Sequence, residues 1–255
     1  MNSPHHSPHA HPVVSREEWL AASRRHLAHE KELTRAYDQL AAERLALPWV
    51  KVDKPYVFQT QEGERTLAQL FGHNSQLLVY HFMLGPNDTE GCIGCSFLTD
   101  HLEGAVVHLE HHDVSVVLVS RASLPHIQRY QARMGWDLAW VSSSGSDFNH
   151  DYRVSFTPDQ VAAGEPIYNH GTAVPVCEDM SGISVFFKDE RGDVFHTYSS
   201  YGRGGEALLG AYMLLDMTPK GRNEAGPDGQ GGMMQWVRRH DQYEAAPKPA
   251  ASCCG

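Results

Sequence analysis

Two short runs of apolar residues constrain the fold of this chain more than any other feature of its sequence. LLVYHFML (77–84) and VSVVLVS (114–120) are continuously apolar, which is typical of strands buried on both faces. Between them, apolar residues from Phe97 to Val106 recur at helical intervals. A strand, a helix and a second strand in this order predict a parallel β-sheet covered by helices.

The segments that follow extend this pattern into a mixed sheet. A helix is expected from Ser123 to Met134, with a short strand over 138–143. ISVFFK (183–188) and VFHTYS (194–199) are typical of a β-hairpin, and a closing helix is expected after it. This order resembles the layout of thioredoxin-like proteins. The expected fold class is therefore α/β, a thioredoxin-like mixed sheet flanked by helices, with an N-terminal helical extension.

The N-terminal extension has clear helix signals. Ser15 and Glu18 have the spacing of a capping box, and apolar residues recur at helical intervals as far as Leu40. Pro48 ends the pattern. We expect one long helix, or two joined, over 15–45. It is expected to pack on the main domain or on a partner chain, and a homodimer is one arrangement that would cover it.

The two ends of the chain differ from its body. The N-terminal end places four histidines among Pro and Ser, which predicts a disordered tail able to bind metal loosely. The C-terminal end carries Cys253 and Cys254, adjacent cysteines whose mutual disulfide would be strained. The expected organisation is a His-rich tail (1–14), a helical extension (15–48), a thioredoxin-like domain (49–244) and a flexible Cys-Cys tail (245–255).

Charge and hydropathy narrow the classes of partner. The formal charge is −10, from 21 basic and 31 acidic residues, which disfavours binding to a nucleic-acid backbone. No apolar run approaches the ~20 residues of a membrane span, and the N-terminus lacks the pattern of a secretory signal. We expect no nucleic-acid partner, no membrane association and a cytoplasmic location. Thiols stay reduced there, so the cysteines are expected to be reactive, metal-binding or inert.

The Cys92-Ile93-Gly94-Cys95 segment is the strongest functional signal. It follows a buried strand and opens a helix, where unpaired N–H groups and the helix dipole stabilise a thiolate. We expect Cys92 to attack a disulfide and Cys95 to resolve the mixed disulfide. The alternatives are two buried cysteines without function, or half of a zinc site, although the sequence has no second C-x-x-C.

His81 is the third candidate site residue. It lies near the end of the incoming strand, roughly where thioredoxin-like folds place a buried acid that moves the proton of the resolving thiol. A histidine there can do the same work near neutral pH, or can bind a metal beside two thiolates. A hydrogen-bonded core histidine is the alternative.

The loop before Cys92 also invites comparison with peroxidases. GPNDTEGC resembles the peroxiredoxin signature, but Pro86 and Thr89 stand one residue too close to the cysteine. Arg121, after the second buried strand, could polarise a peroxide. Cys177 lies alone in a turn-rich stretch and is expected to be inert.

Several longer stretches together resemble a known family. They are EKELTRAYDQLAAERLALPWV, LLVYHFML, GCIGCSF, VSRASL, RMGWDLAWVSSSGSDFN, GISVFFKDERGDVFHTYSSYGRG, LLDMTPKGRNE and WVRRHDQY. On these stretches the chain is similar, over roughly 15–244, to the bacterial thioredoxin-like family of unknown function numbered 899. This resemblance implies a thioredoxin-like fold and places GCIGCSF at the redox position, without supplying a substrate.

One departure from thioredoxins concerns a proline. Thioredoxins carry a cis-proline where this chain has 179–183, which contains no proline. Its absence disfavours general protein-disulfide reduction and favours metal binding.

Three hypotheses follow from these features. The first is a thiol–disulfide oxidoreductase that cycles Cys92 and Cys95 without a cofactor, with an unidentified thiol or disulfide substrate and reductant. The second is a copper-binding protein that uses Cys92, Cys95 and His81 as thiolate and imidazole ligands. The third is an inactive scaffold that dimerises through 15–45.

Overall fold

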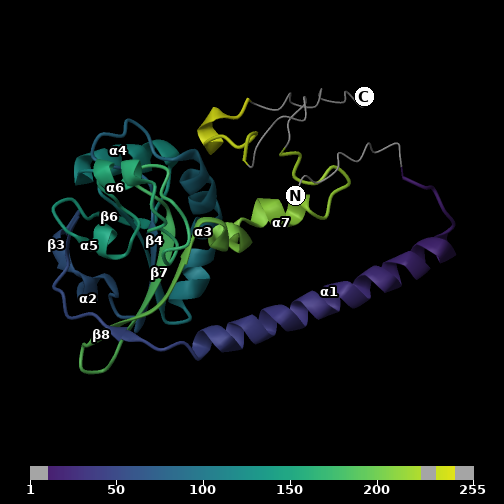
Figure 1. Ribbon diagram of the computed structural model, residues 1–255, viewed down its shortest axis with the longest axis horizontal. Coiled ribbons are helices and arrows are strands. Elements are labelled where there is room, and N and C mark those ends of the chain that lie inside the picture. The colour runs from purple at the N-terminus through teal and green to yellow at the C-terminus, as the bar shows by residue number, and fades with distance from the viewer. Residues whose placement is uncertain (1–10, 225–233, 245–255) are drawn as a thin grey trace, which may run out of the picture.

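The computed structural model describes residues 11–224 and 234–244, and its centre is an eight-stranded sheet with helices on both faces (Figure 1). The strands follow the order β1-β8-β7-β4-β5-β6-β2-β3 across the sheet. They are β1 (Val50–Lys51), β2 (Val57–Thr60), β3 (Gly63–Thr66), β4 (Gln76–His81), β5 (Val114–Ser120), β6 (Ala139–Ser142), β7 (Gly182–Lys188) and β8 (Val194–Tyr201).

Helices connect the strands and close the fold. The α-helices are α1 (Arg16–Leu45), α2 (Leu67–Leu70), α3 (Ile93–Glu110), α4 (Leu124–Met134), α5 (Phe148–Asp151), α6 (Pro158–Ala163) and α7 (Gly210–Leu215). Two 3₁₀ helices, η2 (Gly202–Leu208) and η3 (His240–Gln242), lie near the C-terminus. Among the described residues, none of these helices is both long enough and apolar enough to cross a lipid bilayer.

The two apolar runs form the middle of the sheet, as the sequence predicts. β4 pairs in parallel with β5, β5 pairs in parallel with β6, and the β7–β8 hairpin adds to the other side of β4 in antiparallel orientation. The thioredoxin-like mixed sheet is therefore confirmed. β5 occupies 114–120, the whole of its apolar run, because neighbours on both sides and helices on both faces bury it.

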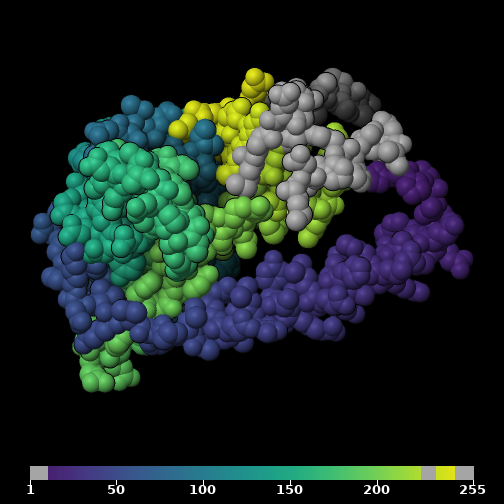
Figure 2. Space-filling model, viewed as in Figure 1, coloured from purple at the N-terminus to yellow at the C-terminus, as the bar shows by residue number. Residues whose placement is uncertain are grey.

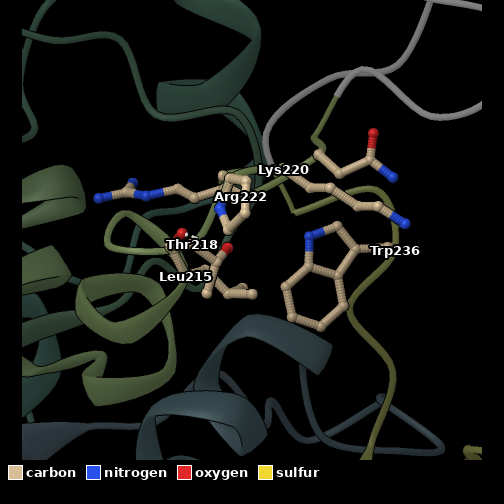
Figure 3. A pocket seen from close by; sticks show the side chains of 8 residues that line it. Leu215, Thr218, Lys220, Arg222 and Trp236 are labelled. Atoms are coloured by element: carbon tan, nitrogen blue, oxygen red, sulfur yellow. Dashed lines mark hydrogen bonds between the residues drawn. The ribbon is translucent and has the colours of Figure 1, made fainter. Parts of the chain in front are cut away.

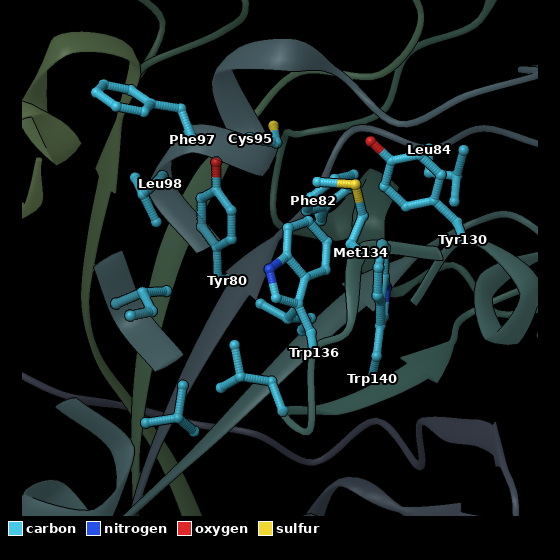
Figure 4. Close-up of a cluster of buried hydrophobic side chains, with 14 of the residues drawn as sticks. Tyr80, Phe82, Leu84, Cys95, Phe97, Leu98, Tyr130, Met134, Trp136 and Trp140 are labelled. Carbon is cyan, nitrogen blue, oxygen red and sulfur yellow. The ribbon is translucent and has the colours of Figure 1, made fainter. Parts of the chain in front are cut away.

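The two faces of the sheet have separate cores. Tyr80 and Phe82 point from the end of β4 into the larger cluster, which α3, α4 and α7 cover (Figure 4). Val79 packs in the second cluster, against side chains from α2, α5 and β2. Successive residues of a strand point to opposite faces, so neighbours in β4 enter different cores.

Helix α1 forms as expected but does not pack as expected. The Ser15 hydroxyl accepts a hydrogen bond from the Glu18 N–H at 3.2 Å, and the Glu18 carboxylate accepts one from the Ser15 N–H at 2.9 Å. No residue of α1 is buried, and the helix stands apart from the body along most of its length (Figure 2). Packing on the main domain was therefore the wrong expectation, while packing on a partner chain stays a prediction.

The C-terminal third differs most from the sequence predictions. The expected closing helix is split into η2 and α7 at Leu209, because glycines crowd its first half and disfavour an α-helix. Residues after 216 include a described segment that docks on the larger core through Val237, which is 1% exposed. The predicted His-rich tail, up to residue 10, and the Cys-Cys tail lie outside the described residues.

Candidate active site

Helix α3 begins at the cysteine pair. Cys92 is its N-cap residue, with dihedrals of φ −55° and ψ 135°, and no side chain makes a capping hydrogen bond to the helix. The Cys92 N–H donates to the Met83 carbonyl at 3.2 Å, which ties the helix start to the end of the β4 segment. The thiol therefore lies at the positive end of an 18-residue helix, where a thiolate is stabilised.

The surroundings of Cys92 favour its thiolate. A hydrogen bond from the Cys95 thiol, the backbone N–H groups of Cys95 and Gly94, and the charge of Arg239 lower the pKa of Cys92 to about 6. Burial acts in the opposite direction and is outweighed. Cys92 is partly exposed and is a free thiol. Its sulfur is therefore largely ionised at neutral pH and can reach a substrate.

Cys95 has the opposite properties. Its side chain is 1% exposed, and burial raises its pKa well above the ordinary value, with the hydrogen bond to Cys92 adding to the rise. Two groups favour its thiolate: the Tyr80 hydroxyl, which hydrogen-bonds to the sulfur, and the Met83 N–H, which donates to it at 3.5 Å. Figure 4 shows the Tyr80 hydroxyl pointing toward Cys95. Cys95 is thus a buried thiol that stays protonated at neutral pH and donates a hydrogen bond to Cys92.

The structure does not bring His81 and the cysteine pair together. His81 follows Tyr80 in β4 and so points to the other face, where its Nε2 is 2.9 Å from the Ser184 hydroxyl and its ring stacks on Tyr152. Burial, and then the charge of His196, lower the pKa of His81 to about 3, so it is neutral at pH 7. The β4 side chain that lies beside Cys95 is that of Tyr80, a residue for which the sequence predicted no role.

A cavity of about 370 Å³ opens beside Cys92. Arg121 lies in its wall, held by Asp179 through two hydrogen bonds of 2.7 and 2.8 Å. Cys177 lies there too, and its thiol donates to the Asp179 carbonyl at 3.0 Å. Burial raises the pKa of Cys177, so it stays a thiol at neutral pH. The lining residues are Met83, Gly85, Pro86, Asn87, Asp88, Glu90, Cys92, Arg121, Cys177, Glu178 and Asp179.

The described C-terminal segment, residues 234–243, braces the helix start; we call it the C-terminal strap. Arg239 donates to the Gly91 carbonyl at 2.6 and 3.1 Å and to the Tyr130 hydroxyl at 2.9 Å. The Tyr130 hydroxyl is 2.9 Å from the Ser96 hydroxyl, which donates to the Cys92 carbonyl at 2.8 Å. Arg239 is therefore linked directly to the Gly91 carbonyl and, through the Tyr130 and Ser96 hydroxyls, to the next carbonyl along the chain.

Packing also fixes this loop. A Cβ at Gly91 would lie 2.7 Å from ring atoms of Phe82 and Tyr130, so only glycine fits between them. Met234 of the strap lies over Gly94, where a Cβ would be 3.2 Å from its terminal carbon. The sequence did hold a signal for the strap, because Trp236 and Tyr243 lie in the WVRRHDQY stretch and aromatic residues are rare in disordered segments.

A second cavity, of about 440 Å³, lies behind the strap. Figure 3 shows Trp236 facing Leu215 and Thr218 across it. None of the site residues expected from the sequence lines this cavity. It is therefore separate from the cysteine site.

Of the three ligands that the copper hypothesis names, only the two cysteines lie together in the structure. Among residues 11–224 and 234–244, no three His, Cys, Asp or Glu side chains are grouped closely enough to hold a metal ion. Cys92 and Cys95 lie together, but His81 points to the other face of the sheet. A third His, Cys, Asp or Glu ligand therefore does not lie beside the two thiols in the described part of the chain.

Comparisons with solved structures find peroxiredoxins at low similarity. The peroxidoxin BcpB from Mycobacterium tuberculosis is 12% identical, with a TM-score of 0.42 over 64% of this chain and 94% of that chain. Peroxiredoxin Q from Xanthomonas campestris is 15% identical, with a TM-score of 0.41 over 62% of this chain and 90% of that one. PrxQ from Xylella fastidiosa is 13% identical, with a TM-score of 0.40 over 62% and 87% of the two chains.

Sequence comparison identifies the family. No curated protein matches the chain. A family profile described as a bacterial protein of unknown function, DUF899, matches residues 8–243. This range includes α1, which we call the helical arm, together with the cysteine pair and the C-terminal strap. Because the match covers nearly the whole sequence, the chain belongs to the bacterial DUF899 family.

Proposed function

We propose that the protein is a thiol–disulfide oxidoreductase in which Cys92 attacks and Cys95 resolves. The observation that supports this most directly is the difference between the two thiols. Cys92 is partly exposed, with a pKa lowered to about 6, whereas Cys95 is buried with a raised pKa. Two cysteines that attack and then resolve need this difference in pKa and exposure. The first sulfur must meet the substrate as a thiolate, whereas the second reacts only after the mixed disulfide has formed.

The reaction has two exchanges. The Cys92 thiolate attacks one sulfur of a substrate disulfide, the substrate S–S bond breaks, and the leaving thiolate takes a proton from solvent. Cys95 then loses its proton and attacks the Cys92 sulfur, which releases the second substrate thiol. The protein is oxidised to a Cys92–Cys95 disulfide and the substrate is reduced to two thiols. A dithiol reductant returns the protein to its starting state.

Tyr80 has a role in the second exchange. Its hydroxyl hydrogen-bonds to Cys95 and favours the Cys95 thiolate, which must form in a buried site. Such a bond to a charged sulfur is worth about 1.5–3 kcal/mol. The Met83 N–H adds a second donor to the same sulfur. These two groups offset part of the cost of ionising a thiol away from water.

Redox titration tests the proposal. Every protein compared carries Cys253→Ser and Cys254→Ser, so that the tail thiols do not contribute. We expect a two-electron couple of about −270 to −200 mV, with the disulfide mapped to Cys92 and Cys95 by mass spectrometry. Cys92→Ser should abolish turnover, and Cys95→Ser should accumulate a mixed disulfide on Cys92. If no reversible Cys92–Cys95 disulfide forms at any applied reduction potential, the proposal is ruled out.

The same two thiols keep copper binding as a second candidate. Two adjacent cysteines, one of them largely ionised, are ligands that Cu(I) prefers. Metal analysis of protein purified without a tag or chelator tests it. About one tightly held copper that is lost in the Cys92→Ala, Cys95→Ala double variant would favour copper binding. Copper that the double variant retains would refute a site at these cysteines.

A further inference from the structure

Resting on the proposed function, we infer that the cavity beside Cys92 takes small disulfides with positive charge and rejects small disulfides with negative charge. The cavity volume of about 370 Å³ lies near the lower end of the range for small-molecule sites, about 300–1,000 Å³. Cys92 is part of its wall, so a molecule in the cavity meets the attacking sulfur. A disulfide of a few heavy atoms on each side fits this space.

Among the described residues that line the cavity, Arg121 is the single cation, and carboxylates surround it. Asp179 holds its guanidinium by two hydrogen bonds, and Glu178 lies 4.0 Å from it. The charges of Asp179, Glu178 and Asp88 all raise the pKa of Arg121. One positive charge therefore faces three negative charges in the cavity wall, and Asp179 already neutralises it.

Asp88 and Glu178 are the carboxylates left over. Asp88 accepts a hydrogen bond from the Gly85 N–H at 2.6 Å, which orients its carboxylate without supplying a positive charge. Glu178 keeps 53% of its side chain exposed at the rim. Both therefore contribute net negative charge where a substrate enters.

Glu90 is the fourth carboxylate of the cavity, and residues that do not line the cavity compensate its negative charge. Arg133 lies 2.6 Å from one of its oxygens and Arg239 lies 2.9 Å from the other. These guanidiniums belong to α4 and to the C-terminal strap, and neither lines the cavity. Arg133 also pairs with Asp241 at 2.7 Å, so these two guanidiniums and two carboxylates sum to zero net charge and leave that of Asp88 and Glu178 in place.

The net negative charge of the cavity wall affects how fast a charged substrate approaches Cys92. A cavity lined by one sign of charge concentrates ligands of the opposite sign and changes their association rates by about 10- to 1,000-fold. The formal charge of the whole chain, −10, acts in the same direction at longer range. Both effects weaken as salt shortens the screening length to about 3 Å at 1 M.

Single-turnover kinetics of the reduced full-length protein test the inference. The probes are cystamine, hydroxyethyl disulfide and dithiodipropionate, which are cationic, neutral and anionic. Each rate is divided by the rate of the same disulfide with a neutral small thiol, which removes differences in intrinsic reactivity. We expect cystamine to be favoured over dithiodipropionate by about 30-fold at low salt, and by less than about threefold at 1 M salt.

Variants show where the preference comes from. Asp88→Asn keeps an oxygen acceptor for the Gly85 N–H, and Glu178→Gln changes an exposed side chain, so both should fold. Each should lower the cystamine preference about three- to fivefold at low salt. The matched control is Glu190→Gln, which removes one exposed carboxylate beyond the far end of β7 and should leave the preference unchanged.

The outcomes separate this inference from the proposed function. If the normalised rates are equal, or favour the anionic probe, while the Cys92–Cys95 disulfide still forms, the charge preference is refuted and the redox function stands. A preference that Glu190→Gln lowers as much as Glu178→Gln also refutes it, because the cavity then has no special part. If no probe oxidises the cysteine pair, the proposed function itself fails.

Discussion

Tyr80 and His81 are neighbours in β4, but they point to opposite faces of the sheet and have different surroundings. On one face, Tyr80 hydrogen-bonds to Cys95, and both side chains are buried in the larger core. On the other face, His81 is locked between Ser184 and the rings of Phe148 and Tyr152. A residue's position along a strand places it near a site, but the parity of that position decides whether its side chain reaches the site.

The strongest test of this comparison sets Cys92→Ser against His81→Asn. We expect Cys92→Ser to reduce disulfide exchange at least about a thousandfold, because it removes the attacking thiolate. His81→Asn should leave the exchange rate within about twofold and lower the free energy of unfolding by about 1–3 kcal/mol, since it disturbs a buried hydrogen bond. Stopped-flow kinetics and chemical denaturation measure the two effects. A tenfold slower exchange in a folded His81→Asn protein would break the comparison.

A smaller effect is expected for the tyrosines of the two faces. Tyr80→Phe removes the hydroxyl bonded to Cys95, so the second exchange should slow about tenfold while the first stays unchanged. Tyr152→Phe, beside His81, is the control and should change neither step. Rapid acid quench with mass analysis follows the mixed disulfide. Equal rates of resolution in both variants would show that the Tyr80 hydroxyl has no part in it.

The strap should have a weaker, pH-dependent effect on the same face. Arg239→Gln removes a positive charge near Cys92 and the brace on Gly91, so the pKa of Cys92 should rise. Exchange should slow about threefold at pH 6.5 and recover by pH 9, where the thiolate forms anyway. Arg238→Gln, which alters a guanidinium bonded to strap carbonyls, is the matched control. A loss that is equal at both pH values would point to misfolding of the loop instead.

The smallest effect is expected for the helical arm. Removing residues 1–43 leaves Arg44 over the ring of Tyr198 and Trp49 beside Phe187, the contacts at the base of α1. Because no residue of α1 is buried, the free energy of unfolding should change by less than about 1 kcal/mol. Chemical denaturation measures this, and a larger loss would contradict it. Sedimentation of both chains shows whether the arm pairs with a second copy.

Local signals predicted much of the fold. The Ser15 capping box, the Ser123 start of α4 and the apolar run of β5 each encode a boundary within a few residues of chain. Helix α6 carries equally good signals, a Thr157 capping box and a left-handed Gly164 at its end, which the sequence analysis left unassigned. Such features depend on neighbouring residues, and a sequence displays them directly.

Contacts between distant segments could not be predicted in the same way. The spacing of Cys92 and Cys95 predicted two thiols at the start of α3, but only the facing of β4 relative to α3 shows that Tyr80, and not His81, lies beside Cys95. The bond from Arg239 to Gly91 joins residues 148 positions apart. No periodicity or spacing encodes such a bond, because it depends on how the closed fold brings the C-terminal strap back to the helix start.

The measurement that tests the central assignment most directly is the pH dependence of cysteine alkylation in the reduced protein, followed separately at Cys92 and Cys95. A thiol reacts as its anion, so a lowered pKa moves the rise in rate to lower pH. We predict that alkylation of Cys92 rises with a midpoint near pH 6 and is level by pH 7.5, while Cys95 stays unreactive across that range. A Cys92 midpoint at pH 8.5 or above, or earlier reaction of Cys95, would contradict the assignment.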